Sequence, residues 1–329
     1  MQRRRLGRTE LSIPALGLGC TTFGREIDEQ TSFKIMDHAL EHGLTLFDTA
    51  ESYGGGNARQ YRRESQGSDQ ERELSNEMHS SELIIGRWLR ERKCRDQVIV
   101  CTKVGPGNDP QNIARAVRDS SDRLGVETID LFMLHVWDEV VPIDESLDAL
   151  TQQVRAGRVR AVGCSNFTGQ QLATSLKCSE QHGFTRFEAI ENIYNLVNTA
   201  AEQDVFSVCA QHEISFVSYS PLGAGFLTGK YTPDRNQLPH GSRFDVMPGH
   251  CEIYFSSHSF RMVDQLRQKS EEMGQPMALL AAAWVTSCPH VSCVLFGARR
   301  LAHLDNAISA LKQGIDPQLR QELQKLRPV

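Results

Sequence analysis

Ile129-Asp130-Leu131-Phe132-Met133-Leu134-His135 is an apolar run of strand length that ends in an imidazole. Two similar runs end in a charged side chain, Leu44-Thr45-Leu46-Phe47-Asp48 and Val98-Ile99-Val100-Cys101-Thr102-Lys103. A phenol follows shortly after the first of these two runs. An acid, a phenol, a cation and an imidazole at or just past strand ends resemble the side chains of one active site. The candidates are Asp48, Tyr53, Lys103 and His135.

The rest of the chain alternates strands with helices. Helical spacing is found at 29–41, around 81–89, after the N-cap and proline pair Asp109-Pro110, and from about Asp144. Five more strand runs, at 15–20, 160–165, 187–191, 214–219 and 291–295, complete a set of eight. This alternation predicts parallel strands with right-handed crossovers, and eight units favour a closed (β/α)8 TIM barrel over an open doubly wound sheet. In such a barrel all strands end at one rim, so residues distant in sequence can meet there.

No linker divides the chain, so we expect one barrel domain over residues 1–329 with two long rim loops. The first, at about 54–80, opens with three glycines, is rich in arginine and glutamate, and lacks apolar periodicity, so we expect it to be solvated or disordered. It lies next to Tyr53, either as a surface insertion or as a lid or partner-docking element. The second, at about 232–256, is rich in proline and glycine and is a candidate for shaping the substrate mouth.

Composition argues against several classes of protein. The net charge of −5 gives no basic surface for nucleic acid, and no apolar stretch approaches the roughly 20 residues that span a bilayer. The nine cysteines are scattered and form no C-x-x-C pair, so they predict neither a disulfide framework nor a metal site, and a reducing cytoplasm fits best. The basic start at 1–5 leads into no apolar segment, which argues against a secretory signal.

The sequence resembles the aldo-keto reductase superfamily over nearly its whole length. The matching stretches are Leu18-Gly19, 47–54, Thr102-Lys103, Asp130-Leu131 with His135, 157–166 and 219–223. The stretch Gly225-Phe226-Leu227-Thr228-Gly229-Lys230-Tyr231 is most similar to the branch that includes bacterial reductases and the potassium-channel β subunits.

Carbonyl reduction by hydride transfer gives a chemical reason for the four candidate side chains. The alkoxide that forms needs a proton donor and a group that stabilises charge. A phenol can donate if an ammonium lowers its pKa from about 10, and a carboxylate keeps that ammonium charged away from water. The resemblance implies that Tyr53 is the general acid, that Lys103 and Asp48 tune it, and that His135 orients the substrate.

Each of these residues also has an ordinary structural interpretation. Taken alone, Asp48 could cap a helix, Tyr53 could fill space, Lys103 could be a solvated strand end and His135 a hydrogen-bonded core imidazole. Their common position at the predicted rim favours the functional interpretation of the set.

The resemblance also implies the cofactor contacts. Ser165 and Asn166 would bind the nicotinamide carboxamide, Tyr219 would stack on the ring or simply fill the core, and Ser220, Leu222 and Gly223 would lie beside the pyrophosphate. The full predicted set of cofactor-binding residues is Gly19, Cys20, Thr21, Asp48, Ser165, Asn166, Glu191, Tyr219, Ser220, Pro221, Leu222, Gly223, Gly297, Arg299 and Arg300.

The adenosine end of the cofactor is harder to assign. A Rossmann domain is not expected, because no G-x-G-x-x-G follows a strand. Gly297-Ala298-Arg299-Arg300 precedes a predicted helix whose N-terminus and arginines could bind a 2′-phosphate, so NADP is preferred and NAD stays possible. The arginines could instead be solvated surface charges. His303 and Asn306 depart from the family's usual pattern in this helix.

A second departure is Glu191, because the family usually has glutamine there to hold the carboxamide. A carboxylate accepts from the amide but cannot donate, and an ionised one favours the cationic oxidised cofactor. We therefore hypothesise that Glu191 strengthens NADP⁺ binding relative to NADPH, the alternative being that it is protonated or turned away.

The favoured function is NADPH-dependent reduction of an aldehyde or ketone. A nicotinamide-binding regulatory subunit of the channel-β type is the alternative, and a Schiff-base aldolase that uses Lys103 is a remote third. Phe23 and Trp137 are predicted to line an apolar substrate mouth, although Trp137 could equally be a packing residue. The sequence identifies neither the substrate nor the oligomeric state.

Overall fold

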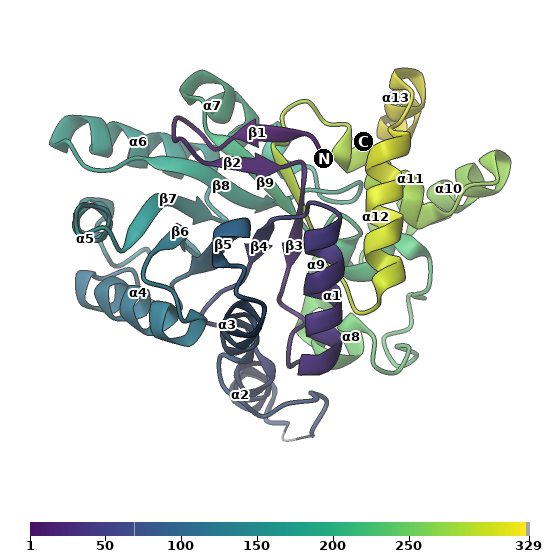
Figure 1. The fold of residues 1–329 in the computed structure, drawn as a ribbon. Coiled ribbons are helices and arrows are strands. Elements are labelled where there is room, and N and C mark those ends of the chain that lie inside the picture. The colour runs from purple at the N-terminus through teal and green to yellow at the C-terminus, as the bar shows by residue number, and fades with distance from the viewer. Residues whose placement is uncertain (69, 327–329) are drawn as a thin grey trace.

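The computed structural model describes residues 1–68 and 70–326, and eight parallel strands close into a barrel within it (Figure 1). Around the barrel the strands follow the order β10, β3, β4, β5, β6, β7, β8, β9. Their bounds are β3 Leu16–Gly19, β4 Leu46–Asp48, β5 Ile99–Lys103, β6 Ile129–Leu134, β7 Val159–Ser165, β8 Phe187–Ile193, β9 Ser215–Tyr219 and β10 Cys293–Gly297. All eight predicted strands, and the predicted (β/α)8 barrel, are confirmed.

Helices surround the barrel, and successive ones pack against each other (Figure 1). They are α1 Glu29–Glu41, α3 Ser80–Arg92, α4 Pro110–Leu124, α5 Ile143–Arg155, α6 Gly169–His182, α7 Val205–His212, α10 Ser257–Met273, α11 Met277–Thr286, α12 Leu301–Gln313 and α13 Pro317–Lys325. Short 3₁₀ turns are η1 Arg95–Gln97, η2 Ala200–Glu202 and η3 Gly223–Thr228. Among the described residues, no helix combines the length and apolarity needed to cross a bilayer.

Helix α4 shows how local sequence sets an element's bounds. The Asp109 carboxylate accepts a hydrogen bond from the Asn112 backbone N–H, and Pro110 occupies the first turn, where its missing N–H costs nothing. Gly125 ends the helix in the left-handed conformation, with φ +66°. The predicted start of this helix is therefore confirmed.

The barrel interior is apolar and closed at its N-terminal end. A hairpin of β1 (Arg3–Arg5) and β2 (Ser12–Pro14) precedes the barrel. Leu6, Leu11 and Ile13 from this hairpin form one buried cluster with inward-facing strand residues. Those strand residues are Leu46, Ile99, Cys101, Leu131, Met133, Ala161, Ala189, Val217, Cys293 and Leu295.

The stretch at about 54–80 is not the solvated loop expected from its composition. Gly55–Gln66 forms helix α2, and the backbone at residues 75–78 lies against its first turn. A Cβ on Gly55 would lie 1.9 Å from the Ser75 carbonyl oxygen, and one on Gly56 would lie 2.6 Å from the Asn76 carbonyl oxygen. The glycines therefore allow a close backbone contact.

The second rim stretch, about 232–256, also contains helical turns, and the two stretches pack together. It includes α8 (Arg243–Val246), η4 (Pro248–His250) and α9 (Cys251–Tyr254). Arg62 of α2 is 1% exposed, donates to both carboxylate oxygens of Glu73 at 2.6 Å, and donates to the Val246 carbonyl at 3.1 Å. The buried ion pair holds α2 against the chain that follows it, and the hydrogen bond to Val246 holds α2 on α8. These tertiary contacts replace the apolar periodicity that α2 lacks.

Replacing Arg62 with alanine is expected to loosen this segment. It would leave the Glu73 carboxylate, whose side chain is 0% exposed, buried without its counter-charge, at a cost of about 3–5 kcal/mol. Hydrogen exchange of the α2 backbone amides should accelerate accordingly. Arg59→Ala is the matched control on the same helix, because Arg59 pairs with the largely exposed Glu71 and should cost about 1 kcal/mol or less. Equal protection of α2 in both variants would contradict the buried-pair argument.

Candidate active site

A layer of polar side chains covers the apolar interior at the C-terminal end of the barrel. Side chains alternate along a strand, so a residue two positions after an inward-facing one also faces inward. Leu46, Cys101, Met133, Ala189 and Val217 belong to the apolar interior cluster. The residues two positions further on form the polar layer, namely Asp48, Lys103, His135, Glu191 and Tyr219.

Lys103 is the centre of this layer, and its side chain is fully buried. Its Nζ donates to Asp48 Oδ1 at 2.5 Å and to the Thr49 carbonyl at 3.0 Å, and lies 3.2 Å from Glu191 Oε2. Burial alone would lower the pKa of Lys103, but the Asp48 carboxylate, together with Glu191 in its ionised form, opposes burial, and the pKa is held well above the ordinary value. Lys103 is therefore a permanent cation.

The phenol of Tyr53 and the imidazole of His135 lie beside this cation. Lys103 Nζ is 5.2 Å from the centre of the Tyr53 ring, and the Tyr53 and His135 rings meet edge to face at 5.7 Å. The structure therefore brings all four residues singled out at strand ends into one group.

The expectation that Lys103 brings the Tyr53 pKa below 10 is wrong for this structure. Burial raises the pKa of Tyr53, and Lys103 only partly opposes it. Asp48 and Glu191 add to the rise, because a negative charge on either carboxyl group repels the phenolate. Lys103 lowers the Tyr53 pKa, as expected, but by less than burial and the two carboxyl groups raise it.

His135 is a neutral imidazole at ordinary pH. Burial and the neighbouring charge of Lys103 lower its pKa to about 3. Its Nδ1 lies 3.4 Å from the Ser52 hydroxyl oxygen. If that hydroxyl donates, the ring hydrogen is on Nε2, and we assign this tautomer because it leaves an N–H donor at the barrel mouth.

The predicted nicotinamide contacts form a hydrogen-bonded chain next to the polar layer. The Tyr219 hydroxyl donates to Asn166 Oδ1 at 2.7 Å, and Asn166 Nδ2 donates to the His135 carbonyl at 3.0 Å and to Ser165 Oγ at 3.1 Å. Ser165 Oγ donates in turn to the Glu191 carbonyl at 2.8 Å. Asn166 has a left-handed backbone, with φ +60°.

The other predicted cofactor residues also lie at this end of the barrel. Gly19 and Gly297 are paired at the last positions of adjacent strands, and Cys20 and Thr21 follow directly. The stretch Ser220, Pro221, Leu222 and Gly223 follows β9, and a Cβ on Gly223, whose φ is +57°, would lie 3.1 Å from the Tyr254 ring. No residue of the predicted set lies at the opposite end.

Arg299 and Arg300 have basic neighbours that the sequence analysis missed. Burial and the charges of Arg299, Arg243 and Arg300 lower the pKa of Lys230 to about 8. Burial and Arg25 lower the pKa of Arg243 to about 10, and Arg299 contributes to that decrease. We call Lys230, Arg243, Arg299 and Arg300 the basic group. Lys230 was present in the stretch that suggested the branch of the family, whereas Arg243 lies in a segment expected to be a loop.

The two residues predicted to line the substrate mouth, Phe23 and Trp137, differ in their burial. Phe23 is fully buried in the main core, so its side chain does not line an open mouth, and that prediction is wrong. It follows β3 closely and belongs to the main core cluster, not to the cluster inside the barrel. Trp137 is half-buried and lies edge-on to Phe167 at 5.2 Å, so it packs against the core while keeping some exposure.

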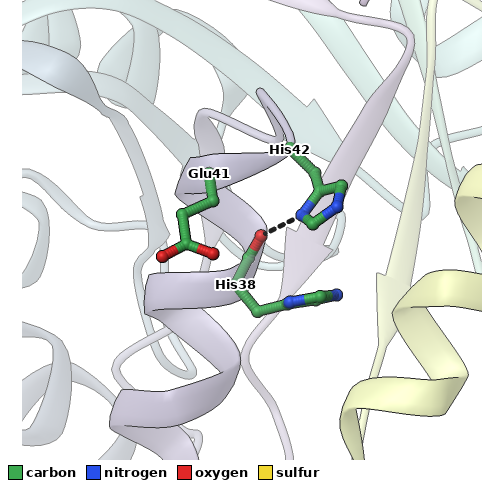
Figure 2. Close-up of side chains that lie close together, drawn as sticks. All are labelled: His38, Glu41 and His42. Carbon is green, nitrogen blue, oxygen red and sulfur yellow. Dashed lines mark hydrogen bonds between the residues drawn. The ribbon is translucent and has the colours of Figure 1, made fainter.

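Two groups of side chains have the composition of a metal site. Asp48, Cys101 and Glu191 have ligand atoms within 4.8 Å of one another, but the Lys103 ammonium already supplies the cation there. His38, Glu41 and His42 gather at the end of α1 (Figure 2).

In this second group both imidazoles have protein partners. His38 Nε2 lies 2.7 Å from Asp305 Oδ1 of α12, and His42 Nδ1 lies 2.9 Å from the His38 carbonyl. Such contacts are common for histidines at a helix C-terminus, so they explain the arrangement of both rings.

Comparison with known proteins agrees with the fold. The model of the aldo/keto reductase family matches residues 15–327. The chain is 29% identical to an uncharacterized oxidoreductase, YrpG, of Bacillus subtilis, over all of this chain and 96% of the relative. It is 26% identical to the L-glyceraldehyde 3-phosphate reductase of Escherichia coli, over 94% of this chain and 88% of the relative. It is also 26% identical to a probable voltage-gated potassium channel subunit beta of Arabidopsis thaliana, over 94% and 91%.

A family match over nearly the whole chain accompanies a closed eight-stranded barrel with a polar layer at its C-terminal end. This chain belongs to the aldo/keto reductase family, and that membership supports an oxidoreductase activity on carbonyl compounds.

Proposed function

We propose that the protein is an NADPH-dependent reductase that converts an aldehyde or ketone into an alcohol, with Tyr53 as the general acid. The observation that carries this proposal is the buried Lys103–Asp48 pair beside the Tyr53 and His135 rings. A buried ion pair costs desolvation energy, and such a cost is typical of a site that needs a fixed charge for its chemistry.

In this proposal His135 and Tyr53 act on the substrate oxygen, and Lys103 and Asp48 support Tyr53. The neutral His135 donates a hydrogen bond from Nε2 and orients the carbonyl. The reduced cofactor, when bound, supplies a hydride to the carbonyl carbon. Tyr53 gives its hydroxyl proton to the oxygen, which completes the alcohol, and Lys103 stabilises the phenolate that remains. Asp48 keeps the ammonium fixed in place.

The donors at the barrel end fit a nicotinamide dinucleotide phosphate. The chain of Ser165, Asn166 and Tyr219 offers hydroxyl and amide groups to a carboxamide, and the aromatic ring offers a stacking face. The basic group fits phosphate, because the charge of Arg299 helps lower the pKa of both Lys230 and Arg243, and an anion would relieve that repulsion. This supports NADP over NAD, which would leave part of that charge without a partner.

We further propose one catalytic unit over residues 1–329 that acts in the cytoplasm. All nine cysteines are free, which is typical of proteins from a reducing compartment.

Two other functions are less well supported. A regulatory subunit of the channel-β type is favoured by the similarity to the Arabidopsis protein, and it would bind nicotinamide with little turnover. A Schiff-base aldolase requires Lys103 to be an uncharged nucleophile, but two carboxylates raise its pKa.

Tyr53→Phe tests the acid directly. With a panel of reactive aldehydes, the rate of NADPH consumption should fall by about 10²- to 10⁴-fold, because the proton donor is lost while the ring is kept. NADPH affinity, measured by fluorescence titration, should stay within about twofold because no cofactor contact is removed. Activity retained in the variant would contradict the role of Tyr53. NADPH binding without turnover in the wild type would favour the regulatory subunit instead.

Lys230→Met tests the basic group. The exchange keeps the apolar stem, which places its ammonium 5.0 Å from the centre of the Tyr231 ring, but removes the charge. NADPH affinity should fall about tenfold and NADH affinity should hardly change, because a charge-assisted contact to phosphate contributes about 1.5–3 kcal/mol. Lys312→Met is the control, because Lys312 is exposed and lies at the end of α12 away from Arg300. An equal loss for both nucleotides would rule out recognition of the 2′-phosphate.

A further inference from the structure

Glu191 is the charged member of the polar layer for which the proposed reduction has no task. It lies in β8 and is 3% exposed. Its Oε2 is within ion-pair distance of Lys103 Nζ, at 3.2 Å, yet it has no aligned hydrogen-bond donor among the described residues. Asp48, by contrast, holds the same ammonium in a direct hydrogen bond.

The charges around Glu191 do not balance if it is ionised. Lys103 and Asp48 neutralise each other, so a second carboxylate would leave a net negative charge in a buried site. The other titratable neighbours are Tyr53, Tyr219, Cys101 and Cys293, and each of these groups is neutral when it keeps its proton. Burial and the charge of Asp48 raise the pKa of Glu191 to about 8, and Lys103 only partly opposes this. The buried site therefore favours the protonated form of Glu191 in the free protein.

A positive charge placed beside Glu191 would reverse this state. Glu191 is paired with Ser165 in the adjacent strand, and its backbone carbonyl accepts from the Ser165 hydroxyl, so Glu191 adjoins the proposed carboxamide contacts. Its charge is also felt at Tyr219, the proposed stacking residue. The nicotinamide ring is a cation when oxidised and neutral when reduced. Only the oxidised form would favour an ionised carboxylate here.

We propose that Glu191 is a proton-binding site coupled to the redox state of the nicotinamide, and that it releases its proton to solvent when NADP⁺ binds and keeps it when NADPH binds. This inference rests on the proposed function, because it assumes that the nicotinamide lies at this end of the barrel. It adds a pH dependence to the cofactor preference expected from the sequence. One proton leaves the protein as one positive charge enters, so the charge of the site is conserved.

Calorimetry in two buffers tests the release of the proton. At pH 7, titration with NADP⁺ in phosphate and in Tris should give different apparent enthalpies that correspond to release of roughly one proton, whereas NADPH should give none. Glu191→Gln, an isosteric change to the family's usual residue, should abolish the release. Tyr53→Phe should keep it, which separates the carboxyl from the phenol as the source of the proton.

Affinity measured against pH gives an independent readout. Because bound NADP⁺ lowers the Glu191 pKa, its affinity should rise by up to about tenfold per pH unit as pH increases toward 8, and level off above that value. NADPH affinity should lack this rise, and the ratio of the two affinities removes the contribution of Lys230, whose pKa of about 8 affects both nucleotides alike. In the Glu191→Gln variant this ratio should be independent of pH, and an unchanged far-ultraviolet circular dichroism spectrum would show that the variant is folded.

The outcomes separate this inference from the proposed function. NADP⁺ that binds the wild type without proton release, or a release that persists in Glu191→Gln, would overturn the role of Glu191 and leave the reductase proposal intact. A wild-type protein that binds neither nucleotide would overturn both.

Discussion

The buried ammonium of Lys103 is the constraint around which the end of the barrel is organised. An ammonium taken out of water costs several kcal/mol unless a fixed partner compensates it, and Asp48 from the neighbouring strand is that partner. The pairing requires Lys103 to face inward. Because side chains alternate along β5, Thr102 then faces outward, and its hydroxyl donates to the buried Glu82 of α3 at 2.6 Å. Arg123 of α4 donates to the other oxygen of Glu82 at 2.6 Å. The register of one strand thus fixes both the catalytic candidates and the helices behind them.

The parts of the structure that were predictable depend on short-range patterns. Apolar runs with a polar end predicted the strands, and the alternation of strands with helices predicted the barrel. The barrel in turn predicted that Asp48, Lys103 and His135 lie together at one rim. Features that depend on tertiary contacts could not be predicted from the sequence. Helix α2 has no apolar stripe and is held by the Arg62–Glu73 pair, whose partners are eleven positions apart in the chain. The basic group joins Lys230 and Arg243 to two arginines beyond residue 298, and the pKa of Tyr53 depends on carboxylates from two other strands.

The two rim stretches that looked irregular are linked to the basic group through α8. Arg62 on α2 donates to the carbonyl of Val246, the last residue of α8, and Arg72 donates to the carbonyl of Asp245. The same short helix begins with Arg243, whose Nε lies 2.7 Å from Glu26 Oε1. The charged insertion is therefore a support for the segment that carries a candidate phosphate contact. Its high content of arginine and glutamate, which suggested a solvated loop, is used for contacts inside the fold.

Glu26 and Glu191 show that burial does not by itself decide the charge of a carboxyl in this protein. Burial raises the pKa of both. At Glu26 the guanidinium groups of Arg243 and Arg25 overcome burial and hold the pKa below its usual range, so this carboxyl is ionised. At Glu191 the neighbouring Lys103 ammonium is already paired with Asp48, and the Glu191 pKa is raised. The barrel mouth thus has surplus positive charge at the basic group. Beside Glu191, by contrast, one further cation would be stabilised. A ligand with phosphates at one end and a ring that can become positive at the other matches this distribution, because each of its charges would lie where the protein lacks the opposite one.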